Sequence, residues 1–350
     1  MKTYILVDFS NLIHRCKHVG NSDIVLKTGM TMHIALNSFK KMWNLFEGNH
    51  VVVCMDGGSW RRSVYPDYKA NRRINDATRS KKEIQDDEFY FSAMDQFADF
   101  LDQKTNVTVI KEKGIEADDI IARWIYLHPD DNHIILSGDS DFYQLLSDNV
   151  KIYDGVKDHI ISTSSVIDNN TNLPVVKTKN IKKKNSAGIM ETKKESSLVL
   201  PPNPKYELFK KIVRGDSSDN IMTAYPGVRE KGTAKKPGII EAFEDMTNKG
   251  YDWNSFMLTE WDKVFMEDGE VITKKVRVLD EYKINEQLID LTKQPLDIKE
   301  KIDNAICSAV DKTPVSQVGI RLMKFCEDMA LTNIGRNPND YAKILNSRYS

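Results

Sequence analysis

The feature that most limits what this chain can fold into is a strand-like run that ends in two carboxylates. Residues 134–138 begin as an apolar, β-branched run and lead through a small-residue turn into Asp139 and Asp141. This layout is typical of a buried parallel strand that delivers acids at its C-terminal edge. Neighbouring carboxylates repel each other unless a proton or a cation lies between them, so a hard divalent ion is their natural companion. Alone, the pair is also explained by the preference of Asp and Ser for turns.

Two other apolar runs end in the same way. Residues 4–7 lead into Asp8, and residues 51–55 lead into Asp56. Asp8 could instead cap a following helix, but the two glycines after Asp56 open a loop and do not start a helix. We expect these strand ends to meet at one edge of a mostly parallel sheet.

A further acidic cluster stands at the start of an apolar helix. Glu116, Asp118 and Asp119 precede or begin the apolar run that continues to Ala122. The helix macrodipole favours an anion at this end by roughly 0.3 to 1 kcal/mol. One cap is enough for a helix, so the surplus of acids indicates metal ligation.

The segment after Asp56 is rich in cations and rings. Up to Lys82 only Asp67 and Asp76 oppose the cations. The basic residues are Arg61, Arg62, Lys69, Arg72, Arg73, Arg79, Lys81 and Lys82, and the aromatic ones are Trp60, Tyr65 and Tyr68. Alternating cations and flat rings suit a nucleic-acid backbone with unstacked bases. A solvated basic surface is the alternative.

Composition sets outer limits on the fold and on the partners. A chain of 350 residues with 40% hydrophobic content can bury one large domain and a smaller one. Its net charge of −1 means that any affinity for nucleic acid must come from segregated basic patches. The four cysteines lack the spacing of a zinc ribbon and fit a reducing compartment. Without a membrane-length apolar stretch or a signal-peptide pattern, we expect a cytoplasmic protein.

The acidic motifs together resemble those of the 5′ nuclease superfamily, which includes flap endonucleases and the 5′ nuclease domain of bacterial DNA polymerase I. They are Val7-Asp8, Met55-Asp56, Glu116-Ala117-Asp118-Asp119, Gly138-Asp139-Ser140-Asp141 and Gly215-Asp216-Ser217-Ser218-Asp219-Asn220, the last similar to the family's GDxxDN. Five motifs in one order carry the resemblance, where any single one would be weak. The element Trp60-Arg61-Arg62, with Tyr68-Lys69 and Asn71-Arg72, most closely resembles the RNase H of T-even bacteriophages.

This resemblance implies a two-metal phosphodiesterase. Two hard cations about 3.5 to 4 Å apart need a carboxylate cage, and oxygen-only ligands select Mg²⁺, or Mn²⁺, over zinc. The ligands implied for the first ion are Asp8, Asp56, Glu116, Asp118 and Asp139, and those for the second are Asp141, Asp216 and Asp219, with Asp119 as a supporting acid. Lys69 would offset charge at the scissile phosphate. Arg61 and Arg72 would assist it or clamp the backbone.

Other residues are expected to hold the nucleic acid. In the basic segment these are Arg62, Tyr65, Tyr68, Arg73 and Arg79. Residues 225–234 stand where the family has a helix-hairpin-helix-like element that holds duplex phosphates, and Gly227, Arg229 and Lys231 are the expected contacts there. The family's glycine pattern is imperfect, because Arg229 replaces its second glycine and Gly232 looks inserted. The family's potassium site is therefore left open.

We expect three parts along the chain. Residues 1–167 form an α/β, PIN-like catalytic domain, with a central mostly parallel sheet flanked by helices and a basic arch at about 60–88. Residues 168–204 are rich in polar residues and lysine, and are expected to be a flexible insertion because they have little apolar surface to bury. Residues 205–350 form a helical C-terminal domain, helical from Ile239 onward, that contains the hairpin element.

The resemblance implies a metal-dependent 5′ to 3′ exonuclease and flap endonuclease. It would act on DNA or RNA–DNA duplexes with 5′ ends and remove RNA primers during replication, in the host cytoplasm if the chain is phage-encoded. We expect a monomer whose partners include replication proteins such as a single-strand-binding protein or a clamp.

Three alternatives remain. A PIN-type endoribonuclease is usually shorter and lacks the motif of Asp216 and Asp219. A phosphatase of the haloacid dehalogenase type needs a second Asp two residues after Asp8, where Ser10 stands. A catalytically inactive DNA-binding scaffold is disfavoured because every expected acid is present.

Overall fold

The computed structural model describes residues 1–17, 23–72, 79–184, 190–267 and 270–349. Arg73, which we expected to bind nucleic acid, lies outside these residues. Among the described helices, none has the length and apolar character needed to cross a membrane.

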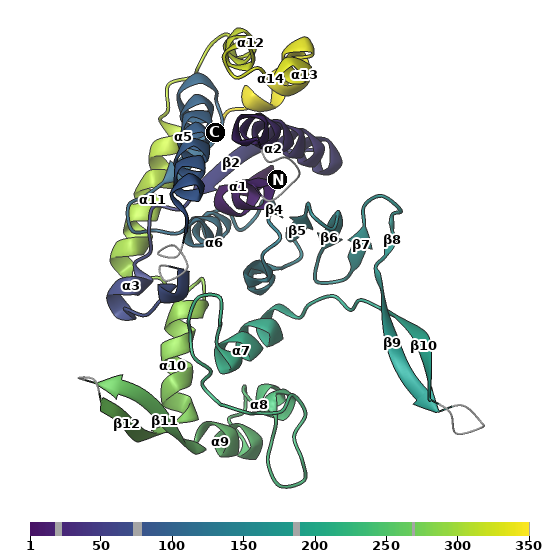
Figure 1. Ribbon diagram of the computed structural model, residues 1–350, viewed down its shortest axis with the longest axis vertical. Coiled ribbons are helices and arrows are strands. Elements are labelled where there is room, and N and C mark those ends of the chain that lie inside the picture. The colour runs from purple at the N-terminus through teal and green to yellow at the C-terminus, as the bar shows by residue number, and fades with distance from the viewer. Residues whose placement is uncertain (18–22, 73–78, 185–189, 268–269, 350) are drawn as a thin grey trace.

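A sheet of eight strands forms the centre of the molecule (Figure 1). Its order is β3-β2-β1-β4-β5-β6-β7-β8, parallel from β3 to β5 and antiparallel from β5 to β8. The strands are β1 (Thr3–Asp8), β2 (His50–Met55), β3 (Thr108–Lys111), β4 (Asn132–Leu136), β5 (Val150–Asp154), β6 (His159–Ile161), β7 (Val166–Asp168) and β8 (Leu173–Pro174). The predicted α/β fold with a mostly parallel sheet is confirmed.

Helices cover both faces of this sheet, and each face has its own core. Ile5 and Val7 of β1 pack against α1 (Phe9–Lys17), α2 (Ile24–Phe46) and α5 (Lys81–Lys104). Tyr4 and Leu6 point to the opposite face and pack against α6 (Ala117–Leu127) and α11 (Leu296–Val310). Because β1 and β2 are buried on both faces, they appear in the sequence as continuous apolar runs.

The end of the chain returns to the first domain. It forms α12 (Val318–Asp328), α13 (Thr332–Arg336) and α14 (Asn339–Leu345), whose buried residues belong to the same core as Ile5. The ring of Phe325 stacks on Phe100 of α5, with centroids 4.1 Å apart. Residues 296–345 thus complete the first domain, whereas we expected them in a separate C-terminal one. Helical periodicity shows that a helix has an apolar face, but not which surface covers that face.

The second lobe lies below the sheet in Figure 1. It is built from α7 (Pro204–Arg214), α8 (Ile239–Glu244), α9 (Tyr251–Met257) and α10 (Val278–Ile289), around a core that includes Phe209 and Phe256. A helical C-terminal region is confirmed, but a hairpin of β11 (Glu260–Glu267) and β12 (Glu270–Arg277) interrupts it. Trp261, in the stretch that we expected to be helical, lies on β11, and its indole N–H donates to the carbonyl of Ala224 at 3.0 Å.

Much of the segment expected to be flexible forms a second β-hairpin. Strand β9 (Val176–Lys184) pairs antiparallel with β10 (Met190–Leu198), and the ribbon projects from the edge of the sheet (Figure 1). We expected flexibility because residues 168–204 have little apolar surface to bury. A ribbon also satisfies its backbone groups through the ladder between its strands, and the register places Lys179 opposite Glu195.

Candidate active site

The first acids come from the C-terminal ends of three parallel strands. Asp8 ends β1, Asp56 follows β2, and Asp139 follows β4. Strand β1 lies between β2 and β4, so successive connections leave it in opposite directions. Such a switch point opens a crevice outside the carboxyl ends of the strands.

Other segments bring further carboxylates to the same crevice. Glu116 and Asp118 come from the start of α6, and Asp141 from the short helix η1 (Ser140–Leu145). Asp216 and Asp219 come from the loop after α7. The separate motifs of the sequence therefore meet in space.

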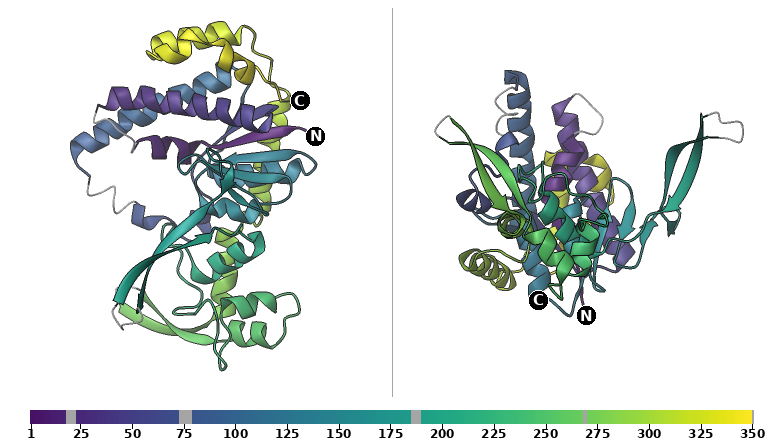
Figure 2. Two further views of the ribbon diagram at one scale, coloured as in Figure 1. Left: turned by 90° about the vertical axis from the view of Figure 1, so that its right-hand side faces the viewer. Right: turned by 90° about the horizontal axis from the view of Figure 1, so that it is seen from below.

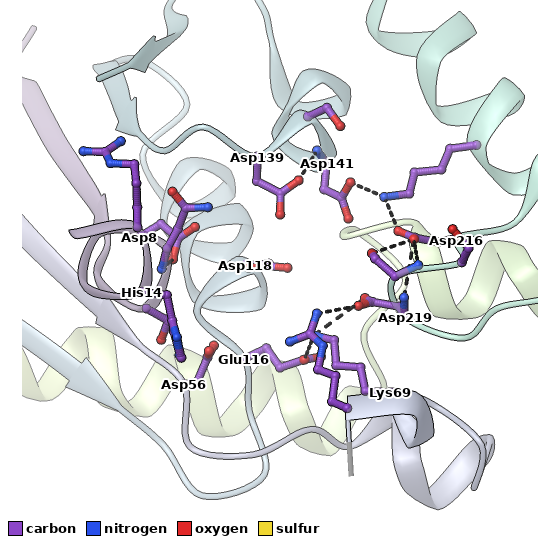
Figure 3. A pocket seen from close by; sticks show the side chains of 18 of the residues that line it. Asp8, His14, Asp56, Lys69, Glu116, Asp118, Asp139, Asp141, Asp216 and Asp219 are labelled. Carbon is purple, nitrogen blue, oxygen red and sulfur yellow. Dashed lines mark hydrogen bonds and ion pairs between the residues drawn. The ribbon is translucent and has the colours of Figure 1, made fainter. Parts of the chain in front are cut away.

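One cavity of about 860 Å³ collects these side chains (Figure 3). Eight of the nine acids that we expected as metal ligands line it, together with four cations. The acids are Asp8, Asp56, Glu116, Asp118, Asp139, Asp141, Asp216 and Asp219, and the cations are Arg15, Lys69, Arg72 and Lys211.

Asp8 has a structural role as well as a place in the cavity. Its carboxylate accepts from the backbone N–H of Asn11 at 3.0 Å and from the hydroxyl of Ser137 at 2.9 Å. The first bond stabilises the start of α1, so the capping explanation of Asp8 is correct, and it is compatible with a place in the cavity.

Lys69 lies between acids from two parts of the chain. Its Nζ is 2.5 Å from Oε1 of Glu116 and 3.6 Å from Oδ2 of Asp219. The backbone of Lys69 is left-handed, with φ 56°, and its N–H donates to the carbonyl of Asp219 at 2.8 Å. Arg72 adds a contact of 2.8 Å to Asp219. This segment therefore ties the last acidic motif to the acids of the sheet.

Lys211 is a cavity residue that our sequence reasoning missed. It stands on α7, forms an ion pair with Asp141, and lies 2.7 Å from Asp216. The available signal was its place on the polar face of a helix that buries Phe209 and Ile212, one turn before the acidic motif. The acidic motifs themselves contain no signal for this lysine. The neighbouring α1 residues Asn11, His14 and Arg15 were missed for the same reason.

The deepest acids are short of positive charge. Burial raises the pKa of Asp8 to about 7, and the charges of Asp56 and Asp139 add to the rise. Burial, together with repulsion from Asp8 and Glu116, holds the pKa of Asp118 well above its ordinary value. These shifts show that the cavity concentrates more negative charge than its cations offset.

Acids with a close cation behave in the opposite way. Burial acts to raise the pKa of Glu116, but Lys69 and Arg61 bring it below its ordinary value. Lys211 likewise outweighs burial and lowers the pKa of Asp216 to about 2. Close cations, together with hydrogen bonds from Ser59 and Ser218, therefore reverse the effect of burial at these two carboxylates.

Residues 3–179 match the family described as "5'-3' exonuclease, N-terminal resolvase-like domain". The chain belongs to this 5′-3′ exonuclease family. Among curated proteins, this chain is similar to the flap endonuclease Xni of Psychromonas ingrahamii. The two are 26% identical over 164 residues, which is 44% of this chain and 57% of that protein. The chain also matches the Xni of Pseudoalteromonas translucida with 28% identity over 170 residues, which is 46% of this chain and 61% of that protein.

Solved structures of bacteriophage T5 proteins share the fold of this exonuclease-family chain. A T5 flap endonuclease, in a pseudo-enzyme-product complex with DNA and metal ions, has a TM-score of 0.58 and 16% identity, covering 89% of this chain and 100% of that one. A T5 5′-exonuclease with bound divalent zinc ions has a TM-score of 0.53 and 18% identity, covering 94% and 98%. At these identities the likeness shows the fold alone.

In this member of the family, Arg61 and Asp119 form a buried ion pair. Arg61 is 1% exposed and Asp119 is fully buried. The two Nη atoms of Arg61 are each 2.9 Å from a different oxygen of Asp119, and Nη1 is also 2.8 Å from Glu116. Asp119 is outside the lining of the cavity. These contacts contradict Asp119 as a metal ligand and Arg61 as a phosphate clamp, because burial keeps both side chains away from a substrate.

The aromatic residues of the basic segment also serve the core. Trp60 is 7% exposed and donates to Asp119, while Tyr68 is 3% exposed and its hydroxyl lies 3.0 Å from Asp219. Tyr65 is half-buried and packs against the same core as Tyr68. The prediction that Tyr68 stacks on bases is wrong, because its ring is enclosed. Alternation of rings and cations in sequence does not show which side chains reach the surface.

The remaining nucleic-acid candidates lie on the surface or near it. Arg62 is exposed, as are Gly227, Arg229 and Lys231 in the loop between α7 and α8. Arg79 forms an ion pair with Asp87 of α5.

The loop between α7 and α8 depends on its glycines. Gly227 has a φ of 67°, which favours glycine. A Cβ on Gly232 would lie 2.5 Å from the nitrogen of Gly238, which explains the glycine that the family pattern lacks.

Proposed function

We propose that this chain is a divalent-metal-dependent 5′ to 3′ exonuclease and flap endonuclease. In this proposal it hydrolyses phosphodiester bonds at 5′ ends and flaps, and acts as an RNase H that removes RNA primers during DNA replication. One observation carries it: eight carboxylates from distant motifs line a single cavity, with Lys69 and Lys211 among them. Membership of the 5′-3′ exonuclease family supports it.

The donor set of the cavity fits Mg²⁺, with Mn²⁺ as a substitute. Carboxylate oxygens are the ligands that these hard ions prefer, and the raised pKa values of Asp8 and Asp118 indicate a need for positive charge. Among the described residues, no three acidic, His or Cys side chains are arranged to hold an ion directly. Water would therefore complete the coordination, as it usually does for Mg²⁺.

We propose two ions with distinct ligand sets. Asp8, Asp56, Glu116, Asp118 and Asp139 would surround the first, and Asp141, Asp216 and Asp219 the second. When bound, such ions activate water and stabilise the leaving oxygen.

Lys69 and Arg72 would act on the substrate directly. Lys69 would leave Glu116 for the scissile phosphate and offset the charge that develops there. Arg72, with a side chain 58% exposed, would orient the same phosphate. Arg61 would hold Glu116 in place from behind.

The substrate proposed is a duplex with a free 5′ end or flap, of DNA or RNA–DNA. Gly227, Arg229 and Lys231 would hold duplex phosphates, and Arg62 the strand near the cavity. The curated relatives are named flap endonucleases, which supports this substrate class. We further propose that the chain acts as a monomer, with a single-strand-binding protein or a clamp as its replication partner.

The test compares 5′-labelled flap, nicked and RNA-primed duplexes, with and without Mg²⁺. We expect cleavage only with the metal, beginning at or near the 5′ end, and suppressed by a bulky group on that end. Equal cutting of closed circular single strands and open 5′-ended substrates would contradict the proposal and favour the PIN-type endoribonuclease. Binding without cleavage on every substrate would favour the inactive scaffold.

A further inference from the structure

The β9–β10 hairpin has a charge pattern that its own folding does not explain. Residues 176–198 contain seven lysines and two glutamates (Lys177, Lys179, Lys182, Lys183, Lys184, Lys193, Lys194, Glu191 and Glu195). Within the described residues, β9 and β10 pair only with each other. A two-stranded ribbon without an apolar face is marginally stable in water, and repulsion between lysines weakens it further.

The register sorts these charges onto two different faces. Paired residues share a face, and neighbours along a strand alternate between faces. On one face Lys179 stands opposite Glu195 and Lys183 opposite Glu191, while Lys177 stands opposite Ser197 and Lys193 opposite Ile181. Two of the four lysines on this face are therefore in register with an acid. We call this the paired face.

The other face carries no acid. Here Asn180 stands opposite Lys194, Lys182 opposite Thr192, and Lys184 opposite Met190. Nearer the sheet, the hydroxyls of Thr178 and Ser196 are 3.1 Å apart. We call this the acid-free face, with Lys182, Lys184 and Lys194 as its lysines. Three lysines on one face without an acid in register suit a row of phosphates.

Spacing also favours a nucleic-acid strand over an acidic peptide of irregular charge. Lysines two residues apart on a strand are separated by about 6.7 Å, which is about twice the 3.4 Å axial rise per phosphate of one DNA strand. Lys182 and Lys184 have this separation in sequence and share a face.

The position of the hairpin fits a substrate that extends beyond the cavity. In both views of Figure 2, the hairpin and the N-terminal end of α5 project on the same side of the molecule. The chain that leaves β10 continues into α7, whose Lys210, Lys211 and Arg214 line a second cavity of about 230 Å³ that shares Asp141 with the first. Cations thus lie beyond the first cavity along α7, where Lys210 pairs with Glu207 and Arg214 with Glu230. The family match ends at residue 179, so most of the hairpin lies beyond it.

We propose that the acid-free face of the hairpin binds the sugar-phosphate backbone of the duplex outside the cleavage cavity. The inference rests on the proposed function for its substrate. The hairpin would act as an electrostatic arm that strengthens binding without base specificity and without a part in the chemical step. Binding would also stabilise the ribbon, because the phosphates offset the repulsion between its lysines.

The test uses two matched triple variants. One is K182Q/K184Q/K194Q on the acid-free face, and the control is K177Q/K179Q/K183Q on the paired face. Both remove three positive charges from the same two-stranded ribbon, so a difference between them reports position rather than total charge. Equal thermal melting of the two variants and the wild type checks that neither change disturbs the fold.

Binding is measured by fluorescence anisotropy without divalent metal, on duplexes with a short or a long double-stranded arm. For the acid-free variant we expect weaker binding to the long arm, little change on the short arm, and a salt slope reduced by up to about 2.7, which is three phosphate contacts at about 0.9 each. The control variant should lose clearly less affinity for the duplex with the long arm. With Mg²⁺, the acid-free variant should raise KM and leave kcat unchanged.

Several results would overturn the inference. Equal losses of DNA affinity in both variants would show only a general electrostatic attraction between the hairpin and DNA. No loss of affinity in the acid-free variant would show that the hairpin does not contact DNA. Retained DNA binding with lost binding of polyglutamate would identify an acidic protein as the partner instead. The anisotropy measurement needs no cleavage. A wild-type protein that binds DNA but never cuts it would therefore contradict the proposed function without affecting this test.

Discussion

At the scale of single residues, Glu116 joins the cavity to the buried Arg61 behind it. Arg61 and Ser59 donate to one of its oxygens at 2.8 and 2.7 Å, and Lys69 donates to the other at 2.5 Å. Tyr68 lies 3.2 Å from the first of these oxygens. The lowered pKa of Glu116 follows from its two cations, which outweigh burial. Glu116 therefore stays ionised, whereas burial disfavours the ionisation of Asp8 and Asp118 in the same cavity.

Replacing Arg61 tests this support directly. Arg61→Ala should lower the free energy of unfolding by about 3 to 5 kcal/mol, because it leaves the buried carboxylate of Asp119 without its cation and removes one of the two cations beside Glu116. The matched control is Arg62→Ala, which removes an exposed arginine next in the chain and should change stability by less than about 0.5 kcal/mol. Urea unfolding measures both. Equal stability of the two variants would show that the buried pair is not structural.

Replacing Asp139 by Asn tests the metal proposal with little change in side-chain shape. Asp139→Asn removes one charge but keeps an acceptor for the N–H of Asp141, which now lies 2.9 Å away. We expect cleavage to fall by more than about 100-fold, while DNA binding is kept or improved because one repulsive anion is gone. The control is Asp130→Asn, the same substitution at an exposed acid outside the cavity. Near-normal turnover of the pure Asp139 variant at saturating Mg²⁺ would contradict the role assigned to this acid.

At the scale of elements, α7 and α10 hold the last acidic motif in position. Asn285 of α10 is buried, and its amide donates to the carbonyls of Ile212 and Met222 at 2.9 and 2.8 Å. These two carbonyls lie on either side of the loop that carries Asp216 and Asp219. One side chain thus joins a helix to both ends of that loop.

Asn285→Leu removes both donors with little change in volume. Two buried carbonyls lose their partner, at a cost of about 1 to 3 kcal/mol each. We expect faster amide exchange at Asp216 and Ile221, which donate to each other's carbonyls at 2.9 and 2.7 Å, and a loss of cleavage. Gln287→Leu, the same kind of change at an exposed position of α10, is the control. Unchanged exchange at these two amides would show that α10 does not hold the loop.

At the scale of the whole molecule, the cavity lies where the two lobes meet. Asp8 and Asp141 belong to the sheet domain, while Lys211 and Asp216 come from the second lobe. Lys211 bridges the lobes by contacting both Asp141 and Asp216. Neither lobe contains a complete site, so binding in the cavity is coupled to how the lobes are held together.

Two strands of the sheet carry buried histidines, and one of them, His50, contacts the end of the chain. His50 contacts the carbonyl of Ser347 at 3.1 Å and the hydroxyl of Thr108 at 2.8 Å, while His133 contacts the carbonyl of His128 at 2.9 Å. Burial lowers the pKa of both His50 and His133 to about 4. The neutral rings are therefore part of the folded state.

These histidines predict a loss of stability in acid. Since the unfolded pKa is about 6.5 and the folded pKa about 4, the unfolded state binds more protons between these values. The stabilisation is complete above about pH 6.5, is lost as the pH falls toward about 4, and amounts to about 3 kcal/mol per histidine. We expect a flatter pH profile in urea unfolding for His50→Gln than for wild type, with His159→Gln, a partly exposed histidine, as the control. Parallel profiles of wild type and His50→Gln would contradict the assignment.

The comparison with a variant is needed because the cavity acids whose pKa values are raised, Asp8 and Asp118, act in the opposite direction. The pKa of Asp8 is raised to about 7 in the folded state, so this group contributes stability in acid that is lost as the pH rises through that value. Its contribution is the same in wild type and in His50→Gln. The difference between their profiles therefore isolates the histidine.

The sequence by itself determined the sheet and its acids. Runs such as Val51–Met55 are apolar over a whole strand because both faces are buried, and the acid after each run must appear at the sheet edge. Asp8, Asp56 and Asp139 meet in the cavity for this reason. These features are local, since each depends on a few adjacent residues.

Only the tertiary structure decided which charged and aromatic residues face the cavity. Arg61 and Arg62 are adjacent in sequence, yet one is 1% exposed and the other is on the surface. Asp118 and Asp119 separate in the same way, because neighbours on a helix point about 100° apart and only one can face the cavity. Lys211 enters the site through contacts between lobes that are distant in the chain. Burial and pairing of charges arise when elements pack, and no local pattern contains them.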